Sequence, residues 1–278
     1  MIAADLRAFG AAVRKELRTV RRYPVMYAGL VFWPVLLPAA YVLMGQAFSG
    51  SNDPRALAAF AERAGTTEVA GFVFIGYAMY MWLSTILWGP GTALRTEQMR
   101  GSLEAVFLTP TSRLVALFGP PVAALPSLVM TFVVMGAAMW LLFGVALPLG
   151  GVVRALVVIA FALPALYAIG TLFAAGVLRF GEISPIVQLV RGLLVLACGI
   201  TFPVLMLPGW AQAVAAVLPP TYVVHDIRAV LLGGLGLSDV AVDLAITVGL
   251  SAIFAALAIV TFGVLERSAR RSGTLGRY

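Results

Sequence analysis

The stretch LRTEQMRGSLEAVFLTP, residues 94–110, lies between two long apolar runs, residues 69–93 and 115–143. Each run is long enough to cross a hydrocarbon core of about 30 Å as a helix. The stretch itself carries the charged side chains of Arg95, Glu97, Arg100 and Glu104. An alternation of membrane-length apolar runs with charged connections predicts an all-α integral membrane protein.

Composition favours the same fold class. Hydrophobic residues make up 62% of the 278 residues and charged residues 11%, whereas ordinary soluble domains are roughly 45–50% apolar. The net charge of +7 would suggest nucleic acid as the partner of a soluble chain, but here the basic residues lie between apolar runs, where they orient a membrane protein. We therefore expect membrane lipids around the chain and no nucleic acid as a partner. The single cysteine, Cys198, makes an intramolecular disulfide impossible.

Six apolar runs are predicted as transmembrane helices: residues 25–48, 69–93, 115–143, 155–178, 186–207 and 240–265. If the N-terminus is cytoplasmic, the outside segments contain only four of the 19 basic residues, namely Arg55, Arg63, Arg154 and Arg228. Basic residues concentrate on the cytoplasmic side of membrane proteins. The sequence therefore predicts a multi-pass protein with both termini in the cytoplasm.

The chain is predicted to form one membrane domain over residues 1–278. Residues 1–24 place apolar side chains at helical spacing and basic ones on other faces, which is typical of a helix lying in the headgroup plane. The basic side chains of this interfacial helix include Arg14, Arg18 and Arg21. The apolar run that follows is too long for a cleavable signal peptide. Residues 25–265 are therefore expected to form the membrane region and 266–278 a basic cytoplasmic tail.

The opening stretch has two faces if it is helical. At about 100° per residue, polar and charged side chains share one arc and apolar ones the other. The polar arc holds Glu97, Arg100, Gly101 and Glu104, and the apolar arc holds Met99, Leu103, Val106 and Phe107. The pattern predicts an amphipathic cytoplasmic helix that ends at Thr109-Pro110. The alternative is a solvated turn whose charges only keep it in the cytosol.

The sequence contains few residues that could couple transport to an ion gradient or to ATP. The central portions of the six runs contain no Asp, Glu, Lys, Arg or His, and ion-coupled transporters usually need such groups at membrane depth, although backbone carbonyls can also bind ions. The only lysine, Lys15, follows no glycine-rich loop, which excludes a P-loop within this sequence. A transporter of this composition would receive its energy from another chain, acting on a cytoplasmic surface such as residues 97–107.

Catalytic and metal-binding residues are sparse. The chain has one histidine and one cysteine and no HExxH motif, so membrane hydrolase or metalloenzyme chemistry has little to build on. His225 and Asp226 are adjacent, and adjacent helical positions face different ways. We therefore expect a structural role for His225, and neither a catalytic nor a metal site.

Two stretches resemble the ABC-2 type permeases, the membrane subunits of ABC exporters for drugs, lipids and polysaccharides. The first is RTEQMRGSLEAVFLTPTSRL (95–114), similar to the family's segment with an acidic residue, Gly-x-Leu-Glu and Thr/Ser-Pro. The second is FPVLMLPGWAQAVAAVLPPTYVVHDIRAVLLGG (202–234), similar to its proline- and tryptophan-bearing segment. Two positions depart from the pattern: Leu218 stands where the family often has asparagine, and the acid before Arg228 is displaced by about one residue.

The resemblance implies a type V exporter fold in which two six-helix halves, identical or paralogous, pair with two ABC ATPase subunits. ATP and Mg would bind in those partners, and this chain would bind no cofactor. The implied ATPase-coupling residues are Glu97, Arg100, Gly101, Glu104 and Phe107. Residues 208–218 and 221–232 would be two short re-entrant helices broken by Pro219-Pro220. The implied external-gate residues are Trp210, Pro219, Pro220, Tyr222, Asp226 and Arg228.

The expected function is export from a bacterial or archaeal inner membrane. An uncharged pathway lined by apolar residues favours a hydrophobic or amphiphilic cargo, such as a drug or lipid, and aromatic side chains keep polysaccharide open. The main alternative is a secondary transporter or channel without an ATPase, followed by a membrane scaffold or enzyme. For residues 208–232 the alternative is an external hairpin that only caps the bundle.

Overall fold

The computed structural model describes residues 24–49, 54–99, 125–180 and 184–271, together with Arg18 and Arg22. All regular structure in these residues is helical, which confirms the predicted all-α class for the described part of the chain. The elements are α2 (Pro24–Ser49), α3 (Pro54–Ala64), α4 (Val69–Met99), α7 (Leu125–Phe143), α8 (Leu149–Phe180), α9 (Ser184–Ala197), the short 3-10 turn η1 (Val204–Met206), α10 (Gly209–Ala216), α11 (Pro219–Leu231) and α12 (Ala241–Arg271).

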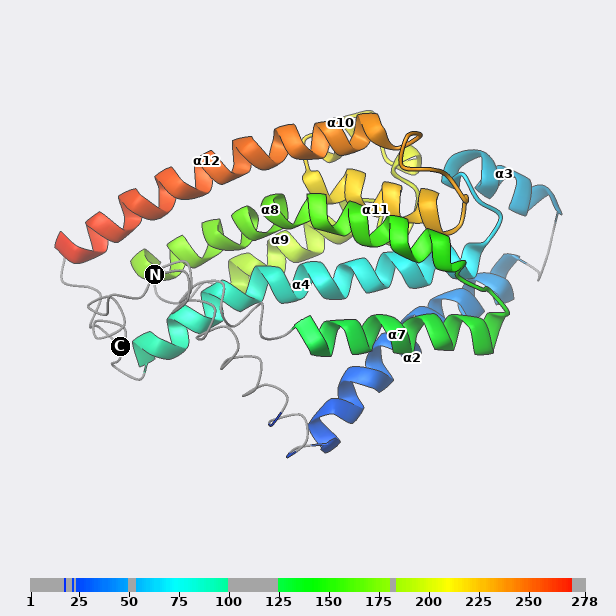
Figure 1. Cartoon of the computed structure of the whole chain (residues 1–278), viewed down its shortest axis with the longest axis horizontal. Helices are drawn as coiled ribbons and strands as arrows, with labels where there is room; N and C mark the ends of the chain where they lie inside the picture. The colour runs from blue at the N-terminus through cyan, green and yellow to red at the C-terminus, as the bar shows by residue number, and fades with distance from the viewer. Residues whose placement is uncertain are drawn as a thin grey trace.

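Helix α8 lies at the centre of the bundle. It packs against α4, α11 and α12, while α2 and α7 pack on α4 and on each other. Figure 1 shows α12 along one edge of the molecule, then α8 and α4, with α2 and α7 along the opposite edge. The core between these layers includes the fully buried Phe74, Leu87, Met139, Leu166 and Ile227.

Small residues allow the two central helices to approach closely. A Cβ on Gly170 of α8 would lie 2.6 Å from the backbone oxygen of Ile86 in α4. Ala162, Ala165, Ala174 and Ala175 of α8 have no exposed surface. Close backbone approach at small residues is how helices gain packing contacts in lipid, where no hydrophobic effect drives them together.

Three helical stretches are long and apolar enough to cross a membrane: Pro54–Thr92, Leu149–Val177 and Ala241–Ser268. A fourth is present if α10 and α11, which are bent by 89°, count as one broken span. Three further apolar helices are shorter within the described residues: Phe32–Ala47, Leu128–Phe143 and Pro185–Ala197. The chain is therefore a membrane protein with apolar helices in each of the six predicted runs.

The predicted span over residues 186–207 is wrong as a continuous helix. Helix α9 ends at Ala197, and Gly199 adopts a positive φ of 70°, a backbone conformation that glycine adopts readily and that commonly ends helices. Pro203 then disfavours helix at the preceding residue. The apolar character of the run is real, but local backbone geometry divides it into α9 and η1.

Other helices are longer than predicted. Helix α4 continues beyond residue 93 through Arg95 and Glu97 to Met99, and α12 continues through Glu266 to Arg271. Residues 266–271 are thus helical rather than a separate tail. The C-terminal ends of α4, α8 and α12 lie at one end of the bundle, whereas α3 and the α11–α12 connection lie at the other (Figure 1). We refer to the latter as the α3 end.

Candidate functional site

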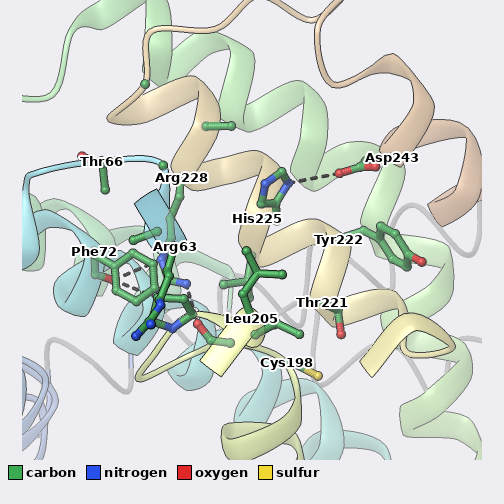
Figure 2. A pocket seen from close by; sticks show the side chains of 18 of the residues that line it. Arg63, Thr66, Phe72, Cys198, Leu205, Thr221, Tyr222, His225, Arg228 and Asp243 are labelled. Carbon is green, nitrogen blue, oxygen red and sulfur yellow. Dashed lines mark hydrogen bonds and ion pairs between the residues drawn. The ribbon is translucent and has the colours of Figure 1, made fainter. Parts of the chain in front are cut away.

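A cavity of about 570 Å³ lies at the α3 end of the bundle, and we call it the polar cavity because ionisable side chains are among those that line it. It is bordered by α3, the start of α4, residues 198–205 and α11, and its charged lining residues are Glu62, Arg63, His225, Arg228 and Asp243. Figure 2 shows these elements converging around Arg228 and His225. The charged lining residues of this cavity thus come from α3, α11 and α12.

Arg228 joins three parts of the chain. Its Nε and Nη2 donate to the backbone oxygen of Phe72 at 3.1 and 2.9 Å, and Nη2 also donates to that of Ile200 at 2.7 Å. Nη1 donates to the backbone oxygen of Gly199. Its Cζ lies 3.4 Å from the centroid of the Phe72 ring, a cation–π geometry visible in Figure 2. The buried guanidinium therefore connects α11 to α4 and to the turn after α9.

Gly76 makes room for this arrangement. A Cβ at position 76 would collide with the Ile200 backbone oxygen and with Nη2 of Arg228. Any larger residue would displace both the turn after α9 and the guanidinium.

The bend between α10 and α11 is held by side chains. The hydroxyl of Thr221 donates to the Ala215 oxygen at 2.7 Å, and that of Tyr222 donates to the Ala216 oxygen at 2.8 Å. Both carbonyls belong to the end of α10, where helix carbonyls lack partners within the helix. Two polar side chains of α11 thus complete the C-terminus of α10.

The N-terminus of α11 begins without a side-chain cap. Leu218 occupies the N-cap position and Pro219 and Pro220 are the first helical residues. Proline has no N–H, so these two prolines remove two of the four donors that a helix start leaves without partners. This explains how a leucine replaces a polar capping residue here, and it places the prolines inside α11 rather than between two helices.

His225 lies between two carboxylates. Its Nδ1 is 3.0 Å from Oδ2 of Asp243 in α12 and 3.5 Å from Oδ1 of Asp226. The His225 side chain is 68% exposed and the Asp226 side chain 0%, so these neighbours do point in different directions along the helix. Nδ1 of His225 is nevertheless close to both carboxylates, since Asp243 reaches it from the next helix (Figure 2).

A second cavity, of about 400 Å³, is apolar. It lies among α4, α7, α8 and α11, and every residue lining it is apolar or glycine, including Phe74, Met79, Phe132, Met135 and Ile227. Ile227 belongs to the same helix as Arg228, so α11 separates the polar cavity from the apolar one. Such a cavity suits an uncharged or amphiphilic molecule.

Comparison with known families decides the class of this membrane protein. Residues 7–232 match the family described as ABC-2 type transporter. The chain belongs to the ABC-2 type transporter family. The match confirms the resemblance seen in the two motif stretches, and it makes the chain a permease component of an ABC transporter. No curated protein sequence gave a significant match.

The predicted coupling residues of this ABC-2 protein are only partly described. The backbone of Glu97 lies near the end of α4. Arg100, Gly101, Glu104 and Phe107 lie outside the described residues, as do Arg14 and Arg21 of the interfacial helix. Arg18 is helical and exposed. The assignment of these residues to ATPase coupling or to the interface stays a prediction.

The predicted gate residues fall into two groups. Arg228, Pro219 and Pro220 are buried where α11 packs against the bundle, and Asp226 is buried beside His225. Trp210 is exposed, and Tyr222 holds the α10–α11 bend. The structure thus brings Asp226 and Arg228 onto one helix at the α3 end without bringing them into contact with each other.

Sequence reasoning missed the contribution of Asp243. The tandem His225-Asp226 was visible, but the third group comes from 17 residues beyond Asp226, at the start of the next helix. The acidic residue in the first turn of α12 was the one available signal. The encounter depends on the fold of the connection 232–240, which residue spacing does not specify.

Proposed function

We propose that this chain is the membrane-spanning permease subunit of an ATP-driven ABC exporter. The observation that carries the proposal is the family match over residues 7–232, because it includes both the charged stretch 94–110 and the α10–α11 segment. The exporter moves a hydrophobic or amphiphilic substrate (a drug, lipid or glycolipid/polysaccharide) out of the cytoplasm or inner leaflet.

The distribution of charge supports an external energy source. In the described residues of α2 and α7 no Asp, Glu, Lys, Arg or His occurs, in α4, α8 and α12 such residues lie near helix ends, and α9 carries Arg191 but no acidic residue or histidine. Side-chain proton or sodium relays through the membrane would need such groups at depth. The sequence also has no P-loop. ATP and Mg therefore bind in two separate ABC ATPase subunits.

The proposed topology has six membrane helices: α2, α4, α7, α8, α9 with the residues that follow it, and α12. Both termini are cytoplasmic, the α3 end faces outward, and α10 and α11 are re-entrant. The bend of 89° between α10 and α11 and their short lengths support a re-entrant pair. Two such halves, identical or paralogous, form the pathway in an inner membrane.

The proposed mechanism transmits force through the end of α4. ATPase closure moves the helix that contains Glu97, Arg100, Gly101, Glu104 and Phe107, and the two halves rock between inward- and outward-open states. The continuous helix from Val69 to Met99 supports this route, because α4 connects the stretch 94–99 to Phe72 and Arg228 at the other end, with Pro90 between them.

The apolar cavity supports the substrate class. It offers aromatic, methionine and aliphatic surfaces and no charged group among its lining residues. A hydrated ion entering it would lose its water without replacement. An acyl chain or a lipophilic drug would lose little favourable hydration on entering it.

Charge reversal tests the coupling assignment. The chain is purified with the P-loop ATPase subunit that co-purifies with it and reconstituted in vesicles, and ATP-dependent transport of a lipophilic fluorescent dye is measured. Glu97→Arg or Glu104→Arg should lower ATP-dependent transport at least about tenfold without altering the yield of folded protein, because a repelled contact loses on the order of 1–3 kcal/mol of coupling.

Glu68→Arg is the matched control, since Glu68 is exposed at the opposite end of α4. It should transport like the parent protein. Unchanged transport-coupled ATPase activity in Glu97→Arg and Glu104→Arg would refute the coupling role. Dye transport driven by an ion gradient without ATP would instead establish a secondary transporter.

A further inference from the structure

The group formed by His225, Asp226 and Asp243 has an unusual deficit of hydrogen bonds. Asp226 has no exposed side-chain surface, yet neither of its carboxylate oxygens has a hydrogen-bond partner. Nδ1 of His225 lies 3.5 Å from Oδ1, which is an ion-pair distance when the imidazole is protonated, but it makes no hydrogen bond with that oxygen. Burying a carboxylate without partners costs several kcal/mol. Such a carboxylate is relieved either by taking up a proton itself or by a positive group beyond those present in the side chains.

A proton on His225 does not meet this need. Nδ1 carries at most one proton, and it lies closer to Asp243, at 3.0 Å, than to Asp226. One N–H directed at Asp243 leaves both oxygens of Asp226 without a partner. A cation placed among the three side chains would contact both carboxylates at once.

We propose that His225, Asp226 and Asp243 bind a divalent transition-metal ion, with Zn²⁺ as the best fit. One nitrogen and two carboxylate oxygens, one from each residue, all lie within 4.8 Å of one another. Tetrahedral Zn²⁺ with bonds of 2.0–2.2 Å requires ligand atoms about 3.3 Å apart. The two distances from Nδ1, 3.0 and 3.5 Å, lie on either side of that value.

The chemistry of the ligands favours Zn²⁺ over Mg²⁺ or Ca²⁺. Mg²⁺ and Ca²⁺ prefer oxygen ligands, whereas imidazole together with carboxylates suits zinc and its neighbours in the first transition row. Two carboxylates and a neutral imidazole also balance the ion's charge of two. The fourth coordination position is open to water, because His225 and Asp243 both line the polar cavity.

The bound ion would connect two helices. His225 and Asp226 belong to α11 and Asp243 to the first turn of α12, while Arg228 on the same α11 is already joined to α4 and to the turn after α9. Metal binding would therefore join α11 to α12 as well. This inference is independent of the proposed export function and holds whichever substrate the protein carries.

Metal titration of the purified full-length chain tests the site. The protein is stripped with a chelator, and Zn²⁺ binding is measured by calorimetry, with Co²⁺ absorption as a probe of tetrahedral geometry. We expect one equivalent of Zn²⁺ per chain and a higher thermal unfolding midpoint when it is bound. Asp243→Asn and His225→Gln should each weaken binding at least about tenfold and abolish the Zn²⁺-induced shift of the midpoint.

Asp239→Asn is the matched control, because Asp239 is an exposed carboxylate four residues from Asp243 that accepts a hydrogen bond from the Gly236 N–H at 2.8 Å. It should bind Zn²⁺ like the parent chain. Asp243 is 30% exposed, so its variant tests the site even if Asp226→Asn fails to fold. The proposal is overturned if the parent chain shows no saturable binding, or if Asp243→Asn and Asp239→Asn bind with equal affinity.

Discussion

Arg228 accommodates a buried charge without a carboxylate. Every polar partner of its guanidinium in the described part of the chain is a backbone oxygen, from Phe72, Gly199 or Ile200. The planar fork of arginine presents several donors in fixed directions, so one side chain reaches carbonyls on two separate segments. Lysine, with a single ammonium group, would not span them. The residue therefore holds α11 against α4 and the turn after α9.

Replacing Arg228 with methionine should destabilise the protein. Arg228→Met retains a long apolar side chain but leaves the Gly199 and Ile200 carbonyls without their donors. We expect the free energy of unfolding in detergent to fall by about 3 kcal/mol. Arg267→Met is the control, since Arg267 is exposed and donates to Gly263 of its own helix at 2.9 Å. Equal unfolding transitions for the two variants would contradict this stabilising role of Arg228.

Helices α10 and α11 depend on each other. With eight and 13 residues, neither is long enough to be a stable helix alone. The 89° bend between them is fixed where Thr221 and Tyr222 donate to the final carbonyls of α10. The pair is thus a single unit, in which two hydroxyl groups add to backbone hydrogen bonds such as that from Leu218 N–H to the Ala215 oxygen at 3.1 Å.

Removing either hydroxyl should loosen this unit. Thr221→Val and Tyr222→Phe keep the shape of the side chain and lose one hydrogen bond each, which contributes about 1 kcal/mol. We expect faster amide hydrogen exchange across residues 209–217 in both variants, measured by mass spectrometry. Thr201→Val, at an exposed threonine outside the unit, should leave exchange in that segment unchanged. Unaltered exchange in all three variants would show that the hydroxyls do not hold the bend.

The whole molecule exposes large apolar side chains on opposite edges. Phe32 and Trp33 of α2 and Ile259 and Val260 of α12 are each more than half exposed. In water such surfaces would aggregate, so they suit contact with lipid tails or with the second permease half proposed above. The polar cavity, by contrast, lies at the α3 end, which is consistent with an end that faces an aqueous phase.

Cysteine labelling tests the proposed orientation of the molecule. In a Cys198→Ala background, Ser238→Cys lies in the α11–α12 connection and Arg267→Cys lies near the end of α12. A membrane-impermeant thiol reagent added to intact cells should modify Ser238→Cys. It should modify Arg267→Cys only after permeabilisation. The reverse pattern would invert the topology, and labelling of both in intact cells would rule out α12 as a span.

Apolar run length predicted α4, α8 and α12 well, because a helix in lipid needs only enough apolar residues to cross it. It predicted residues 186–207 badly, because Gly199 and Pro203 end the helix inside this apolar run. Run length alone does not register such single residues. The contact between Arg228 and Phe72 joins residues 156 positions apart, and no local sequence pattern in either segment predicts it. Likewise His225 meets Asp243 only through the folded connection between their helices.

The close fit around Gly76 links three distant positions in evolution. Since a Cβ there would overlap both Nη2 of Arg228 and the Ile200 carbonyl oxygen, positions 76 and 228 are not free to vary independently. A lineage that acquires alanine or serine at 76 must shift the turn at 199–200, and must also move or shorten residue 228. Among relatives of this protein, arginine at position 228 should therefore be accompanied by glycine at 76, whereas glycine at 76 can persist without arginine at 228.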